Sequence, residues 1–72
     1  MINDANKALS KIYAALTRAG YKATLRAADG RVDVAGRDGS NYGTIHVGTD
    51  VAPTTLCTKK IRLIAFAAAT GC

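Results

Sequence analysis

The sequence predicts a single α+β domain over residues 1–72, in which a helix, a three-stranded antiparallel meander and a C-terminal helix follow one another. An apolar stripe with helical spacing fills residues 4–19, apolar and polar residues alternate over much of 21–47, and an alanine-rich apolar stripe follows later in the chain. A short meander buries one face only, so both helices are expected to pack on the same face of the sheet.

The N-terminal segment, residues 4–19, is predicted to be an amphipathic helix. Leu9, Ile12 and Leu16 recur at intervals of three and four residues, which places them on one face. Gly20 follows, and glycine most easily takes the left-handed conformation just beyond a helix end. The helix is therefore expected to end before Gly20.

The Asp29-Gly30 pair predicts a tight two-residue hairpin, because a type I′ turn requires positive φ at both central positions. Such a turn fixes the register of the two flanking strands. The expected cross-strand pairs are Ala27 with Val32, Leu25 with Val34, and Arg26 with Asp33. The apolar pairs then meet on the inner face, and the opposite charges meet on the outer face.

A second turn signal at residues 38–41 precedes a third predicted strand near residues 42–47. Ile45 and Val47 are expected on the inner face of the sheet. The outer face then collects polar side chains from all three strands, namely Lys22, Thr24, Arg26, Arg31, Asp33, Tyr42, Thr44 and His46.

Residues 54–70 fit two interpretations. Pro53 is excluded from the middle of a central strand and suits the first turn of a helix. Beyond it, Ile61 and Ile64 fit a helical stripe, whereas the alternation from Ile61 to Ala65 also fits a strand. Alanine, the strongest helix former, dominates the end of this segment, so a helix is preferred.

The chain carries a net charge of +5, with ten lysine and arginine residues against five acidic ones. A basic balance favours acidic partners, either an acidic protein surface or nucleic acid. No apolar segment is long enough to span a membrane, and no secretory signal is recognisable. We therefore expect a cytoplasmic protein without a membrane partner.

Cys57 and Cys72 are too few for a disulfide scaffold, and neither has the partner spacing of a zinc site. Cys57 is expected to pack as a small apolar residue. The glycines form neither a GxGxxG nor a P-loop pattern, and spacing alone assembles no nucleophile with a base. These patterns predict no metal, no cofactor, no small-molecule substrate and no catalytic residue.

Two groups of residues, each made up mainly of basic side chains, are the candidate binding residues. Basic side chains that flank an aromatic ring can hold phosphates and stack a base. The group on the outer face of the sheet consists of Lys22, Arg26, Arg31, Tyr42 and His46. The group that opens the last segment consists of Lys59, Lys60 and Arg62. Cations in the first turns of a helix oppose its dipole, which indicates a bound anion.

The element order, with paired lysines early in the last helix, resembles the double-stranded-RNA-binding domain. That family carries a KKxAK motif at this place, and Lys59-Lys60-Ile61-Arg62-Leu63 matches it at the two lysines. Arg62 and Leu63 stand where the family has alanine and lysine, and the tight Asp29-Gly30 turn replaces its longer first hairpin loop. The resemblance implies binding to duplex RNA.

The same element order is similar to that of the HicA-type toxins, which cleave mRNA. The likeness is carried by Ala19-Gly20-Tyr21 at the helix end and by Asp29-Gly30-Arg31 in the turn. The family's catalytic histidine follows a Gly-Ser pair, whereas Gly39-Ser40 is followed here by Asn41. A ribonuclease reading would therefore have to use His46.

A small basic chain without motifs is typical of the regulators and inhibitors of phages and mobile elements. Such proteins dock on host complexes that handle nucleic acid, for example a CRISPR effector or RNA polymerase. We therefore predict a non-catalytic, protein-binding regulator or inhibitor. The alternative is a nucleic-acid-binding module, and a third hypothesis is a toxin centred on His46. A core this small gains from association, so a homodimer is one option.

Overall fold

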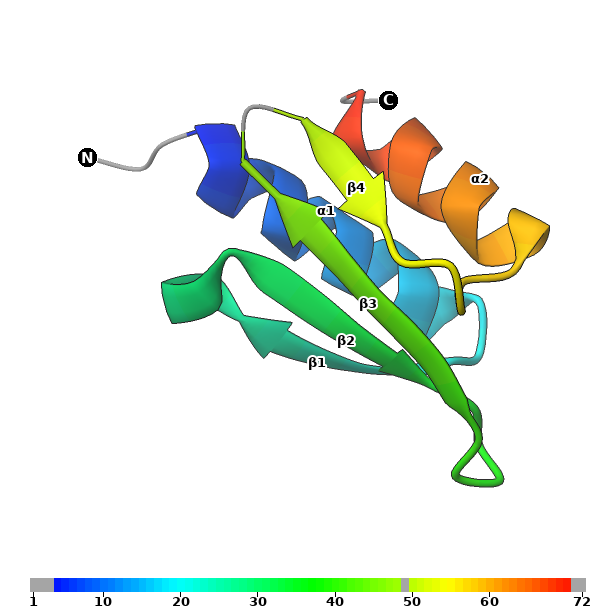
Figure 1. The fold of residues 1–72 in the computed structure, drawn as a ribbon. Helices are drawn as coiled ribbons and strands as arrows, with labels where there is room; N and C mark the ends of the chain where they lie inside the picture. Colours follow the sequence, from blue (N-terminus) through cyan, green and yellow to red (C-terminus); the bar gives the residue numbers. More distant parts are fainter. Residues whose placement is uncertain (1–3, 49, 71–72) are drawn as a thin grey trace.

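A layer of two helices packs on one face of a four-stranded antiparallel sheet (Figure 1). The structure is a computed structural model that describes residues 4–48 and 50–70. Along the chain the elements are α1 (Asp4–Arg18), β1 (Lys22–Arg26), the 3-10 turn η1 (Ala27–Asp29), β2 (Arg31–Ala35), β3 (Asn41–Val47), β4 (Val51–Pro53) and α2 (Lys59–Ala69). The predicted α+β class and the helix at each end are confirmed. Cys72 lies outside the described residues.

Helix α1 ends in a Schellman motif built on Gly20. The backbone N–H of Tyr21 donates to the carbonyl of Leu16, and the N–H of Gly20 donates to the carbonyl of Thr17. The donor–acceptor distance is 3.1 Å in both bonds. Gly20 has a φ of 101°, a backbone conformation that residues with a Cβ rarely adopt. The Tyr21 ring packs against the core next to the helix end. The predicted role of Gly20 is therefore confirmed.

The sheet has one strand more than the sequence predicted. Its order is β1-β2-β3-β4, and β4 pairs with β3 through Val51, Ala52 and Pro53. The prediction that Pro53 begins a helix is wrong. Pro53 ends a short edge strand, where its missing N–H leaves no neighbouring strand without a donor.

The β1–β2 register differs from the predicted one by two residues. Leu25 pairs with Val32 and Ala23 with Val34, because the loop holds four residues rather than two. Within this loop only Gly30 takes positive φ, at 66°, so the type I′ turn does not form. A shift of two preserves the faces, so Val32 and Val34 remain inside. Two inward predictions are wrong, however, because Leu25 is 40% exposed and Ala27 lies in the exposed turn.

Strand β3 contains a bulge at Gly43. Thr44 pairs with Asp33 while Asn41 pairs with Ala35, so β3 has one residue more than β2 between these pairs. Gly43 has a φ of 95°, and its N–H donates to the Asn41 side chain over 3.0 Å. The extra residue reverses the alternation and turns Tyr42 toward the core. There its ring meets the edge of Tyr21, with 5.8 Å between ring centroids.

The core lies between the helices and the inner face of the sheet. Its buried members are Leu9, Ile12, Leu16, Val32, Val34, Ile45, Val47, Cys57, Ile61 and Ala65. Residues 59–69 form the predicted helix, which begins only after a loop and is capped by the Thr58 hydroxyl, an acceptor for the Ile61 N–H. Cys57 is buried as predicted, although it lies before the helix. Neither described helix is long and apolar enough to cross a membrane.

Candidate functional site

Three residues of the sheet group lie in one cross-strand row on the outer face. Arg26 pairs with Arg31, and Arg31 pairs with His46 on the next strand. Lys22 lies at the other end of β1, opposite Ala35. The outer face therefore gathers two arginines and a histidine at one end of the sheet, with Lys22 apart from them.

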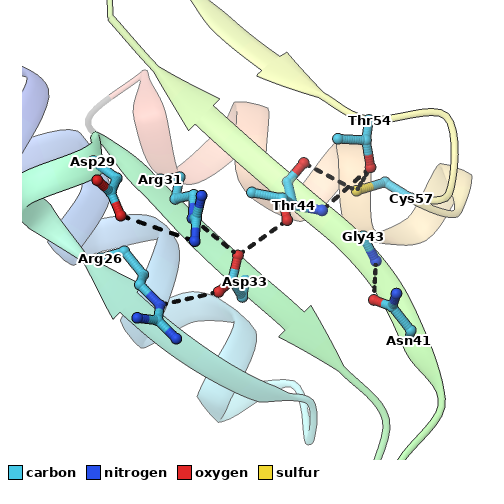
Figure 2. A network of polar contacts seen from close by, with 9 residues as sticks. All are labelled: Arg26, Asp29, Arg31, Asp33, Asn41, Gly43, Thr44, Thr54 and Cys57. Atoms are coloured by element: carbon cyan, nitrogen blue, oxygen red, sulfur yellow. Dashed lines mark hydrogen bonds and ion pairs between the residues drawn. The ribbon is translucent and has the colours of Figure 1, made fainter.

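The central carboxylate of this face, Asp33, engages both arginines (Figure 2). Arg26 Nε donates to Asp33 Oδ2 over 3.2 Å, and Arg31 Nε lies 3.4 Å from Oδ1. The Thr44 hydroxyl donates to Oδ1 over 3.0 Å. Arg31 also lies 3.9 Å from a carboxylate oxygen of Asp29. The positive charge of this face is therefore largely balanced by acids within it.

The pKa of Asp33 reflects this network. Partial burial raises the pKa, but the hydrogen bonds from Thr44 and Arg26 and the charges of Arg31 and Arg26 lower it further than burial raises it. The net effect holds the pKa of Asp33 below its ordinary value, so the carboxylate stays charged at neutral pH. The contact expected between Arg26 and Asp33 is present, although the two residues are diagonal rather than directly opposite.

Tyr42 does not lie with the sheet cations. The bulge at Gly43 turns its ring to the inner side, where it packs against Tyr21 and the core. His46 is exposed on the outer face between Arg31 and Ala52. The aromatic stacking platform expected beside the cations is therefore not formed by Tyr42.

In the second group, Arg62 differs from the two lysines. Arg62 is half-buried, and its guanidinium donates to the carbonyls of Cys57 and Thr54 over 3.1 and 2.9 Å. These bonds tie the loop before α2 to the helix. Lys59 and Lys60 are exposed in the first turn of α2. The pair of lysines remains available to a partner, whereas the guanidinium of Arg62 holds the loop.

The excess positive charge lies on the helices. We call the exposed side of α1 and α2 that is turned away from the sheet the helical face. Its cations are Lys7, Lys11, Arg18, Lys59 and Lys60. The sequence has no acidic residue over 5–28 or 51–72, so no carboxylate of α2, or of α1 after its first residue, balances them. These acid-free segments are the signal that could have identified Lys7, Lys11 and Arg18 as candidates.

The helical face also presents apolar surface. Leu63 and Phe66 of α2 are 61% and 43% exposed. A groove of about 430 Å³ runs between α1 and α2. It is lined by apolar residues, Ala14, Ala15, Ile64, Ala67 and Ala68, and by two cations, Lys11 and Arg18. Apolar surface beside uncompensated cations suits a partner that is both acidic and apolar.

Within residues 4–48 and 50–70, no three histidine, cysteine or acidic side chains come together as a metal site. The thiol of Cys57 is buried and lies 3.7 Å from the Thr44 carbonyl. No protein-family model, curated protein or solved structure matches the chain.

Proposed function

We propose that this chain is a small, non-catalytic binding protein that docks on an acidic protein surface through its helical face. Charge segregation between the two faces carries the proposal. Beyond Asp4, the first residue of α1, the two helices that carry these cations have no acidic residue, whereas Arg26 and Arg31 on the sheet share Asp33. A partner with acidic groups gains most from the face whose charge is not already balanced.

The exposed apolar side chains favour a protein partner over a phosphate backbone. Leu63 and Phe66 lie on α2 beyond the paired lysines, and the neighbouring groove is lined mostly by alanine and isoleucine. Protein interfaces combine an apolar centre with a charged rim, whereas contacts to the nucleic-acid backbone are made by polar and cationic groups. The helical face has the first composition.

The proposed role is that of a regulator or inhibitor of a host assembly that handles nucleic acid. The support is chemical. A cationic face can occupy an acidic patch of such an assembly, or compete there with the assembly's own basic partners. The chain's small size and compact fold suit blocking by occupancy, which needs affinity and shape without a reaction centre.

Affinity purification from a nuclease-treated bacterial lysate tests this proposal. Lys60→Glu reverses one charge on the helical face, and Lys22→Glu makes the same charge change on the sheet. A carboxylate in the first turn of α2 favours the helix, so Lys60→Glu keeps the fold. We expect a stoichiometric protein partner to be lost with Lys60→Glu and retained with Lys22→Glu. Recovery that disappears on nuclease treatment, or that falls equally with both variants, contradicts the proposal.

Binding to duplex nucleic acid is the second candidate, supported by the exposed lysines at the start of α2. If this is the function, Lys59→Ala with Lys60→Ala should reduce the slope of log K against log salt by about two. Lys22→Ala is the control on the sheet. Duplex affinity that is unchanged between low and physiological salt would exclude this candidate.

A further inference from the structure

The lining of the groove between α1 and α2 suits contact with a third helix. The two helices run antiparallel on the sheet (Figure 1). Ala15, Ile64 and Ala68 are half-buried where the helices meet, and Ala67 is exposed at the margin. Small side chains leave a hollow of about 430 Å³ between the helical ridges. A ridge of larger apolar side chains from another helix can fill such a groove.

The cations of the groove are arranged at helical spacing. Lys11 and Arg18 line it from α1 and are seven residues apart, about 10.5 Å along the helix axis. Two residues seven apart on a partner helix share one face at the same separation. Carboxylates at such positions would reach both cations while the residues between them cover the apolar lining.

We propose that the groove binds an acidic amphipathic helix of the partner protein, a proposal that rests on the proposed function. The helix carries carboxylates seven residues apart, which pair with Lys11 and Arg18. Large apolar side chains at the third and fourth positions between them contact Ile64 and Ala67. Charge complementarity selects an acidic segment. The apolar lining selects a peptide, because a phosphate backbone has no apolar groups that could cover this lining.

The test uses a synthetic helical peptide of about 18 residues, long enough to be partly helical alone. The peptide carries glutamates seven residues apart with leucines at the third and fourth positions between them. A control peptide of the same composition places the glutamates five residues apart, which puts them on different faces. Binding is measured by calorimetry and located by amide chemical shifts. We expect shifts in α1 and α2, and an affinity lower by about tenfold for the control peptide.

Three variants alter the groove, and two further variants serve as controls on the sheet. Lys11→Glu should weaken binding by about tenfold and Arg18→Gln by about fivefold, while Lys22→Glu on the sheet changes little. Ala67→Trp at the groove margin should abolish binding, whereas Ala52→Trp on the exposed face of β4 should not. Circular dichroism checks that each variant is folded, and a variant that unfolds is replaced by Lys11→Gln or Ala67→Leu.

Three results would overturn the proposal. They are the absence of peptide binding, binding that is unaffected by Lys11→Glu, and a duplex RNA that shifts the groove amides where the peptide does not. The failure of this inference can be distinguished from failure of the proposed function. If Lys60→Glu removes the purified partner while Lys11→Glu and Ala67→Trp retain it, the helical face binds protein but the groove holds no acidic helix.

Discussion

At the scale of the residue, Gly43 combines two requirements that alanine cannot meet. Its φ of 95° lies in the left-handed region, and a Cβ there would collide with the side chains of Thr54 and Leu56. The loop before α2 therefore packs directly on the backbone of β3 (Figure 2). Gly39 also has positive φ, at 89°, but nothing lies within 4 Å of the place where its Cβ would be.

Gly43→Ala should lower the free energy of unfolding by about 3 kcal/mol, because strain at positive φ and overpacking against the loop add. Gly39→Ala has the strain alone and should lose about 1 kcal/mol. Urea denaturation of both variants measures the difference. Equal losses would show that the loop does not press on Gly43.

The Asp33 network predicts how stability depends on pH. The pKa of Asp33 is lowered in the folded state, so its contribution is complete above the ordinary value of 3.8 and is lost as pH falls through the lower folded value. Asp33→Asn should therefore be less stable than the wild type at neutral pH, and the gap should shrink on acidification. The pKa of Asp38 is lowered by hydrogen bonds from Ser40. Because Asp38 is present in both the wild type and Asp33→Asn, its contribution cancels in the difference in stability between them. A gap that is constant from about pH 6 to 2 would contradict this prediction.

At the scale of the element, Arg62 joins β4, its following loop and α2. Its guanidinium donates to the Cys57 carbonyl and to the Thr54 carbonyl, and the Thr54 carbonyl also accepts from the backbone N–H of Cys57. Sequence reasoning grouped Arg62 with Lys59 and Lys60 because the three are close in the chain. Their side chains nevertheless have different surroundings, since only Arg62 is half-buried.

Arg62→Lys should destabilise the fold by about 1–2 kcal/mol, because an ammonium cannot reproduce the two directed guanidinium bonds. Lys60→Ala at the exposed surface should change stability by no more than about 0.5 kcal/mol. Thermal and urea unfolding of the two variants tests the contrast. A harmless Arg62→Lys would show that the loop is held by other contacts.

The elements that the sequence predicts well are those with a period of their own. Helix α1 has a long apolar stripe and a glycine at its end, and Ile45 and Val47 mark β3 by alternation. Strand β4 was missed because three residues have no period, and its pairing with β3 is a tertiary contact. The side on which Tyr42 lies depends on the bulge, for which the only local sign was a glycine within a strand.

At the scale of the whole molecule, the sequence shows the amount of charge but not its distribution. Cations are spread along the chain, yet folding places two arginines around Asp33 on the sheet and five other cations on helices that have no acidic residue beyond Asp4. The candidate site could therefore be predicted only in part. Lys59 and Lys60 were identified from sequence, whereas Lys11 and Arg18 gain their interest from the groove that α2 forms beside them.

The uneven charge can be measured without a partner. An anionic paramagnetic cosolute should broaden the amides of α1 and α2 more than those of β1 and β2, relative to a neutral cosolute of the same size. The contrast should fade at about 1 M salt, where the screening length falls to about 3 Å. Equal broadening of both faces at low salt would show that the charge is not segregated in solution.

The two edges of the sheet have different consequences for self-assembly. Strand β4 is three residues long and ends in Pro53, so one margin offers little backbone for another chain to extend. At the opposite margin is β1, five residues long, and no other strand of residues 4–48 and 50–70 pairs with its outer edge. If two copies paired through their β1 strands, the β1 edge of each copy would be covered. Only the two short β4 edges would then remain exposed. We therefore expect edge-to-edge pairing through β1 to stop at two copies, because the short strand β4, which ends in Pro53, offers a further chain little backbone to pair with.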